Sequence, residues 1–170
     1  MPISFQPEGA WTALVTPFEK KGKFSLDSFQ RLVEFQLAQG INGLVPAGTT
    51  GESPALTWEE HNLLIEETVK AARGKVGVLA GTGSNCTEEA ITATQHAREA
   101  GACAALLVDC YYNGPSSLEL RTEYYEPVLE WISEIPIVPY IIPGRSGTAL
   151  PRWCACGHSP SAQLFVTGPA

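Results

Sequence analysis

The sequence has no apolar run that approaches the length of a membrane span, and positive charge is scarce. Eleven lysines and arginines stand against eighteen aspartates and glutamates, so the net charge is -7. Because nucleic acids and anionic membranes repel an acidic chain, we expect neither as the main partner. The first seven residues lack the charged and apolar regions of a signal peptide, so we expect no export.

Cysteine is also scarce, and its spacing fits no disulfide framework. The five cysteines are Cys86, Cys103, Cys110, Cys154 and Cys156. An odd number of cysteines without an export signal predicts reduced thiols and a cytoplasmic location. Cys154, Cys156 and His158 lie close together, but their spacing fits no common zinc pattern and offers no fourth ligand. We therefore expect neither a metal site nor a cofactor.

Carboxylates and lysines are missing from the last part of the sequence. Glu134 is the last acidic side chain, and Lys75 is the last lysine. Residues 151–170 show no helical periodicity and carry one formal charge. We interpret them as an irregular tail foreign to the fold, of the kind that a shifted reading frame would produce. The folded region is then residues 1–150.

Within residues 1–150, short apolar runs alternate with amphipathic segments. Five apolar runs predict strands at residues 10–15, 43–46, 76–80, 104–108 and 136–142. Apolar residues at helical spacing predict four helices between them, with capping boxes at Thr57/Glu60 and Ser116/Glu119 and with Thr87 as a cap. The repeat of about thirty residues matches the βαβ unit. The sequence thus predicts an α/β fold, either an open doubly wound sheet or part of a (β/α)8 barrel.

Polar, glycine-rich residues follow the predicted strands, where both of these folds place their sites. The second strand is followed by Gly48-Thr49-Thr50-Gly51-Glu52-Ser53. The glycines allow a ligand to approach the backbone, and N–H groups before a helix favour a small anion such as a carboxylate. The alternative is an ordinary turn with hydroxyl caps. Gly81-Thr82-Gly83 alone is weak evidence for a nucleotide, because the sequence has neither a G-x-G-x-x-G after its first strand nor a Walker sequence.

Five segments in order, all at predicted strand ends, resemble one known family. They are Val15-Thr16-Pro17-Phe18, Gly48-Thr49-Thr50-Gly51-Glu52-Ser53, Ala80-Gly81-Thr82-Gly83, Tyr111-Tyr112-Asn113-Gly114-Pro115 and Tyr140-Ile141-Ile142-Pro143-Gly144-Arg145-Ser146-Gly147. On these segments, residues 9 to about 150 resemble the class I, pyruvate-dependent aldolase family of dihydrodipicolinate synthase and N-acetylneuraminate lyase. The resemblance implies a (β/α)8 TIM barrel, of which this sequence carries about the first five βα units.

The resemblance also implies a mechanism, in which pyruvate forms a Schiff base with a lysine of the sixth strand and reacts as an enamine. Thr49 and Thr50 would hold the pyruvate carboxylate. Thr50, Tyr140 and Tyr112 would form a proton relay, with Tyr112 supplied by the neighbouring subunit. Arg145 resembles the arginine that binds the carboxylate of the second substrate. The residue types suit these roles, because tyrosine and threonine hydroxyls shuttle protons and arginine binds carboxylates bidentately.

Plainer interpretations exist for three of these residues: Tyr112 as a turn residue, Tyr140 as a core residue and Arg145 as a solvated charge. Within the family, Thr49 and Arg145 favour the synthase over the lyase. The synthase condenses pyruvate with aspartate semialdehyde in the diaminopimelate route of lysine biosynthesis. Ile141 departs from the family, in which asparagine is common after this tyrosine. The alternative is another aldolase of the family, acting on N-acetylneuraminate or 2-keto-3-deoxy sugar acids.

A second resemblance is to the family's site for L-lysine as an effector. The matching residues are Ser53, Trp58, His61, Asn85, Glu89 and Tyr111. Pro54 and Trp58 differ from the commonest bacterial pattern, and Trp58 and His61 would equally serve as packing on a helix face. The family assembles as a dimer of dimers, so we expect a homo-oligomer.

The lysines of the sequence depart from the family. They are Lys20, Lys21, Lys23, Lys70 and Lys75, and none follows the predicted fifth strand. None is placed like the Schiff-base lysine that the resemblance implies, so we expect the chain as given to be inactive. The alternatives are a non-catalytic fragment that pairs with full-length partners, and a lysine-binding sensor.

Overall fold

The computed structural model describes Phe5, residues 8–132 and residues 134–148. The predicted tail at residues 151–170 lies outside the described residues. The chain divides into two compact units. Unit one holds the residues up to Gly81 together with Glu99–Cys103, and unit two holds Thr82–Arg98 and the residues from Ala104 onward.

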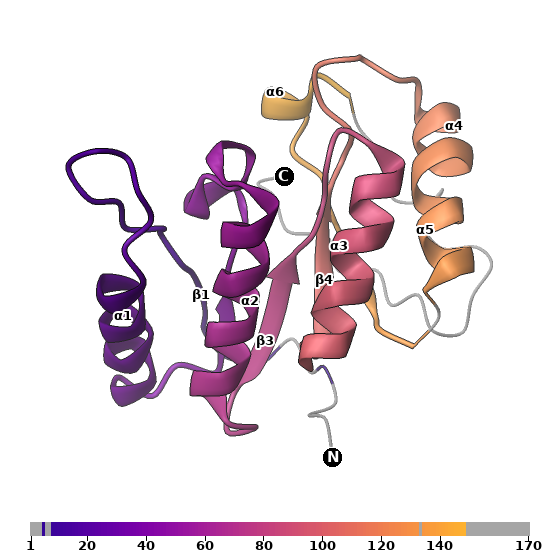
Figure 1. Ribbon diagram of the computed structural model, residues 1–170. Coiled ribbons are helices and arrows are strands. Elements are labelled where there is room, and N and C mark those ends of the chain that lie inside the picture. Colours follow the sequence, from indigo (N-terminus) through magenta and orange to yellow (C-terminus); the bar gives the residue numbers. More distant parts are fainter. Residues whose placement is uncertain (1–4, 6–7, 133, 149–170) are drawn as a thin grey trace. The chain divides into compact units, whose positions relative to one another are not determined.

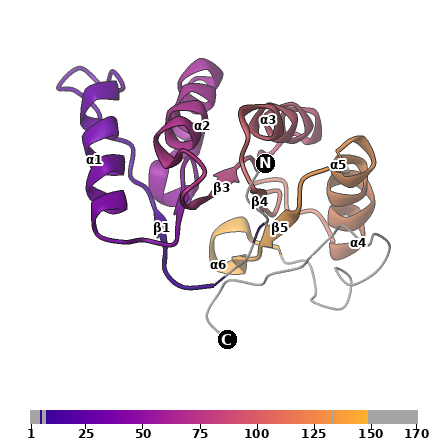
Figure 2. The same cartoon turned by 90° about the horizontal axis from the view of Figure 1, so that it is seen from below.

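Unit one contains three parallel strands in the order of the sequence. They are β1 (Trp11–Ala13), β2 (Gly43–Val45) and β3 (Gly77–Gly81), and Leu44 of β2 pairs with Thr12 and with Val78. Helix α1 (Leu26–Ala38) follows β1. Two short 3₁₀ turns, η1 (Thr49–Gly51) and η2 (Ser53–Ala55), and then helix α2 (Trp58–Ala72) follow β2. The two long helices lie side by side (Figures 1 and 2).

The helix boundaries of unit one agree with the sequence signals. The capping box of α2 is confirmed, because the Thr57 hydroxyl accepts from Glu60 N at 3.2 Å and Glu60 Oε2 accepts from Thr57 N at 3.0 Å. Helix α1 ends before Gly40, whose φ of +77° is the left-handed conformation that glycine adopts without strain.

The core of unit one lies between its strands and its helices. Six buried residues form a cluster: Leu14, Phe24, Phe29, Val33, Leu44 and Leu64. Strands β2 and β3 both begin with glycine, and the indole of Trp11 lies over both. A Cβ added at Gly43 would lie 2.2 Å from the Trp11 ring, and one at Gly77 would lie 2.4 Å from it. The glycines thus make room for a large aromatic ring at the start of the sheet.

Unit two contains two parallel strands, β4 (Ala104–Val108) and β5 (Ile137–Tyr140). Helix α3 (Thr87–Ala100) precedes β4, and its last two residues belong to unit one. Along the chain, β4 and β5 are joined by three consecutive helical elements: helix α4 (Ser117–Glu119), the π-helical segment η3 (Leu120–Tyr125) and helix α5 (Glu126–Trp131) (Figure 1). A short helix, α6 (Pro143–Ser146), follows β5. Val108 pairs with Tyr140, so β4 and β5 end level with each other.

A single α-helix was predicted after β4, but the middle of this helical region is not α-helical. Its capping box is confirmed, with Glu119 N donating to Ser116 Oγ at 3.3 Å, but the next six residues form a π-helical segment. Adjacent tyrosines in this segment both reach β4. The Tyr124 hydroxyl donates to Val108 O at 3.2 Å, and the Tyr125 hydroxyl lies 3.3 Å from Leu107 O. The wider π turn keeps two consecutive side chains directed at the same strand.

Two further expectations needed correction, and one element was missed. The first and fifth strands are shorter than predicted, because the chain leaves the sheet before Thr16-Pro17 and after Tyr140. Thr87 is the first residue of α3 rather than its cap, and its hydroxyl donates to Glu123 O at 2.8 Å. The short helix α6 was not predicted. Across the described residues, no helix combines the length and the apolar character needed to cross a bilayer.

Candidate functional site

The loop between β2 and α2 presents Thr49 and Thr50 on the surface of unit one. Both threonines are exposed and begin the η1 turn, which Gly51 N closes by donating to Gly48 O at 3.0 Å. Within the part of the chain that the structure describes, neither threonine donates a hydrogen bond to another residue. The loop therefore offers two hydroxyls and two backbone N–H groups to a small anion.

This loop is held from two sides by neighbouring strand ends. Thr16, just after β1, donates its hydroxyl to Gly51 O at 2.6 Å in a buried position. Gly81, the last residue of β3, donates its N–H to Pro46 O at 2.9 Å. A Cβ at Gly81 would lie 2.4 Å from Ala47 O, so only glycine permits this approach. Thr16 and Gly81 both belong to motifs of the sequence, but their support of this loop was not predicted.

Replacing Gly81 with alanine should lower the free energy of unfolding by about 1–3 kcal/mol, because the added methyl group meets backbone rather than a mobile side chain. Urea unfolding of the wild type and the variant measures the loss. Gly144→Ala is the matched control, since a Cβ there meets no atom within 4 Å. Equal urea midpoints for Gly81→Ala and the wild type would show that the loop is not held in this way.

In unit two, the segment after β5 carries Tyr140 and Arg145. Tyr140 is half-buried at the end of the strand, and Arg145 is exposed on α6. Ser146 is buried, and its hydroxyl lies 2.8 Å from Thr148 O. Thr148 in turn donates to Pro115 O at 2.6 Å. These bonds tie the segment after β5 to the loop after β4, which carries Tyr112.

Tyr112 has an unusual backbone and no packing role of its own. Its φ is +76°, a left-handed conformation that costs energy for a side chain with a Cβ, and its side chain is 94% exposed. The interpretation of Tyr112 as a residue that packs its own turn does not fit this exposure. The Tyr112 side chain therefore lies almost entirely in solvent, and its part in the relay stays a prediction.

The six residues of the expected effector set divide between the units. In unit one, His61 is buried, its Nε2 lies 2.9 Å from Gly81 O, and its ring packs edge-on against Trp58 at 5.0 Å. His61 thus also helps to fix the end of β3, while Ser53 begins η2. This geometry agrees with the alternative that Trp58 and His61 pack on a helix face, and it leaves the effector role a prediction.

The unit-two members of the set lie near the end of β4. Ser84 donates to Glu89 Oε2 at 2.5 Å, and the Cys110 thiol lies 3.2 Å from both oxygens of Asn85. Burial raises the pKa of the half-buried Tyr111 hydroxyl, with smaller contributions from Cys110 and Glu89.

A buried pair of polar side chains, Asp109 and Tyr125, lies near the end of β4 and was not predicted from the sequence. The Asp109 side chain is completely buried, and its Oδ1 accepts from the Tyr125 hydroxyl at 2.6 Å. Burial and the charge of Asp109 raise the pKa of Tyr125 well above its usual range. Tyr125 therefore remains a hydrogen-bond donor at neutral pH, which suits a structural role.

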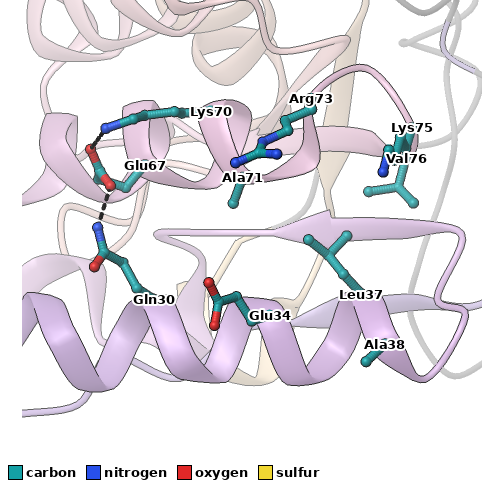
Figure 3. Close-up of a pocket in the computed structure, with 10 residues that line it drawn as sticks. All are labelled: Gln30, Glu34, Leu37, Ala38, Glu67, Lys70, Ala71, Arg73, Lys75 and Val76. Carbon is teal, nitrogen blue, oxygen red and sulfur yellow. Dashed lines mark hydrogen bonds and ion pairs between the residues drawn. The ribbon is translucent and has the colours of Figure 1, made fainter.

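A groove of about 580 Å³ lies between α1 and α2, lined by side chains of both helices (Figure 3). Glu67 lies at one end and accepts from Gln30 Nε2 at 2.6 Å and from Lys70 Nζ at 3.2 Å. The hydrogen bond from Gln30, followed by the interactions with Lys70, lowers the pKa of the Glu67 carboxyl. No motif of the sequence falls here, and we interpret the groove as a solvated helix–helix contact.

The variant Glu67→Gln should be slightly less stable at pH 7, by a few tenths to about 1 kcal/mol. Since the pKa is lower in the folded chain than in the unfolded chain (about 4.3), the contribution is present above that value and is lost as pH falls through the folded pKa. Urea unfolding at neutral and acidic pH measures the difference between variant and wild type. Glu34→Gln, an exposed position across the groove, is the control. A difference that persists unchanged in acid would contradict this assignment.

No group of three or more histidine, cysteine, aspartate or glutamate side chains is placed to share a metal ion, as far as the described residues go. The cluster of Cys154, Cys156 and His158 lies outside those residues.

In a comparison with sequence models of protein families, the model of the Dihydrodipicolinate synthetase family matches residues 6–152 of the chain. A 4-hydroxy-tetrahydrodipicolinate synthase of Ruegeria pomeroyi is 52% identical over 139 residues, which are 82% of this chain and 47% of the relative. One of Roseobacter denitrificans is 50% identical over 139 residues, with the same coverage. The chain therefore spans about half the length of the curated relatives it matches.

A comparison with solved structures also finds dihydrodipicolinate synthases, and the chain again covers about half of each. The chloride-inhibited dihydrodipicolinate synthase of Acinetobacter baumannii complexed with pyruvate is 41% identical, with a TM-score of 0.83 over 88% of this chain and 51% of that one. The enzyme of Cyanidioschyzon merolae with lysine bound is 35% identical, with a TM-score of 0.81 over 86% of this chain and 49% of that one. These neighbours are (β/α)8 barrels, so the predicted fold class is confirmed.

Proposed function

The chain belongs to the dihydrodipicolinate synthetase family, and we propose that it supplies the carboxylate-binding and proton-transfer half of a synthase site. The reaction is the condensation of pyruvate with aspartate semialdehyde in lysine biosynthesis. The observation that carries the proposal is the loop of Thr49 and Thr50, which is anchored by Thr16 and Gly81 and exposes its donors. Such a loop suits a small carboxylate such as that of pyruvate.

In the proposed mechanism, Thr49 and Thr50 bind the pyruvate carboxylate through their hydroxyls and backbone N–H groups. A lysine amine adds to the pyruvate carbonyl, and the imine forms with loss of water. Tyr140 gives and takes the protons of this step, and the hydroxyls of Thr50 and Tyr112 pass them on. The imine loses a proton from its methyl carbon to give the enamine, which attacks the aldehyde carbon of aspartate semialdehyde.

Arg145 is proposed to bind the carboxylate of aspartate semialdehyde. It is exposed on α6, a turn after Tyr140, and guanidinium geometry matches a planar carboxylate. Among the residues of this sequence, the amine nucleophile has no candidate. All five lysines are exposed, and none follows β5.

The proposal includes a homo-oligomer, of dimer-of-dimers type, in the cytoplasm. Tyr112 supports the oligomer, because a tyrosine that is 94% exposed on a strained loop is suited to enter a neighbouring subunit. L-Lysine as an effector is a proposal for the set that includes Asn85, Glu89 and Tyr111. Its support is the lysine-bound relative of Cyanidioschyzon merolae.

A chimera tests the proposed function. Residues 9–148 of this chain replace the aligned segment of the Ruegeria pomeroyi relative, which keeps the rest of its own sequence. We expect the chimera to condense pyruvate with aspartate semialdehyde and to be inhibited by L-lysine. Cleavage of N-acetylneuraminate or of a 2-keto-3-deoxy sugar acid, without condensation, would favour the alternative aldolases. A folded chimera that is inactive on all of these would contradict the proposal.

A further inference from the structure

Two cysteines of unit two, Cys86 and Cys110, are both neighbours of Asn85, one along the chain and the other in space. The Cys110 thiol, half-buried two residues after β4, lies 3.2 Å from Asn85 O and 3.2 Å from Asn85 Oδ1. Cys86 is the next residue after Asn85, and its side chain is exposed. The N–H of Cys86 donates to Ser84 Oγ at 3.2 Å, which fixes the backbone of this loop.

Covalent geometry limits the separation of the two cysteines. The chain has no cis peptide bond among its described residues, and a trans peptide places a carbonyl oxygen about 2.8 Å from the next Cα. Cys110 Sγ is therefore within roughly 6 Å of Cys86 Cα, since it lies 3.2 Å from that oxygen. A disulfide places each sulfur about 4 Å from the partner's Cα, so rotation of the exposed Cys86 side chain and a small loop shift suffice.

We propose that Cys86 and Cys110 form a thiol pair that closes to an intramolecular disulfide when the chain meets hydrogen peroxide. Cys103 is no competitor, because it is buried in unit one and donates its thiol hydrogen to Val78 O at 3.2 Å. The cross-link itself does not depend on the proposed synthase function.

The chemistry proceeds in two displacements. The Cys86 thiolate attacks one peroxide oxygen, the O–O bond breaks, and hydroxide leaves, so that Cys86 becomes a sulfenic acid. Cys110 then attacks the Cys86 sulfur as its thiolate, the S–O bond breaks, and the S–S bond forms. Each departing hydroxide takes up a thiol proton, so two thiols and one peroxide give one disulfide and two waters.

The surroundings assign the order of the two steps. Burial, together with the neighbouring Cys86 and Asp109, raises the pKa of the Cys110 thiol, so Cys110 is mostly protonated at neutral pH. Cys86 is exposed to the oxidant and reacts first. Oxidation removes the hydrogen that Cys110 gives to Asn85, so both Asn85 oxygens lose this partner.

Peroxide titration of the full chain tests the proposal, with Cys154→Ser and Cys156→Ser in every sample to remove the two tail thiols. We expect loss of two hydrogens by intact mass, loss of two alkylatable thiols together, and recovery of both with dithiothreitol. Tryptic digestion without reduction should join residues 76–98 to residues 99–121, because cleavage falls after Lys75, Arg98 and Arg121.

Three variants distinguish the outcomes. Cys103→Ala should keep the link, which shows that Cys110 is the partner within residues 99–121. Cys86→Ser, an exposed change that leaves packing intact, and Cys110→Ser should each abolish it. The proposal is overturned if Cys86 stops at the sulfenic acid while Cys110 stays alkylatable. It is also overturned if Cys103→Ala abolishes the link, or if non-reducing gels show only dimers joined through Cys86.

Discussion

Treated with pyruvate and borohydride, the 170-residue chain should gain no reduced pyruvate adduct, and it should turn over aspartate semialdehyde at least about a millionfold more slowly than the Ruegeria pomeroyi relative. This factor is taken from a serine protease, in which loss of the nucleophile lowered kcat by on the order of a millionfold. The five lysines are all exposed, two on or after α2 and three in the loop between β1 and α1. An exposed amine lacks the dry surroundings that activate a Schiff-base lysine.

Intact mass after borohydride reduction is the readout of this prediction. The Ruegeria pomeroyi relative, treated in parallel, should take up one reduced pyruvate per chain. Stoichiometric labelling of a single lysine in the 170-residue chain, together with turnover, would show that one of these five lysines does serve as the nucleophile.

In the chimera, Tyr140→Phe should lower kcat by about 10²- to 10⁴-fold, because general acid–base catalysis contributes on this scale. The KM for pyruvate should change little, since the carboxylate contacts proposed for Thr49 and Thr50 are unaffected by this change. Steady-state kinetics with varied pyruvate separate the two parameters.

Tyr124→Phe is the matched control for this variant. It removes the hydroxyl of a buried tyrosine that bonds Val108 O and Ser84 N, outside the proposed relay. We expect lower stability and an unchanged kcat. A Tyr140→Phe chimera with the kcat of its parent would show that Tyr140 is a core residue with a solvated hydroxyl, as in its plainer interpretation.

The order of strands and helices was predictable because both signals are local. Apolar runs and capping boxes act within a few residues, and α2 begins with the hydrogen bonds that Thr57 and Glu60 predict. The π segment was not predictable. It depends on two adjacent tyrosines reaching carbonyls of β4 that lie sixteen to eighteen residues earlier.

In the candidate site, too, the local motif was predictable from the sequence and the contacts between distant segments were not. The motif of Thr49 and Thr50 between glycines indicated an anion-binding loop, and the loop does expose both residues. Its supports lie far off in the sequence, with Thr16 bonding Gly51 and Gly81 approaching Ala47. Their role appears only once β1 and β3 are placed beside β2. The exposure of Tyr112 and its left-handed backbone were likewise not predicted from the sequence.

The most direct test of the account is a crystal structure of the chimera after reduction with borohydride and pyruvate. We predict that the pyruvate carboxylate lies within hydrogen-bond distance of Thr49 and Thr50, and that the hydroxyls of Thr50 and Tyr140 lie within about 6 Å of each other. A carboxylate bound elsewhere, or a larger separation of these two hydroxyls, would contradict the claim that this chain carries the carboxylate-binding and proton-transfer half of the site.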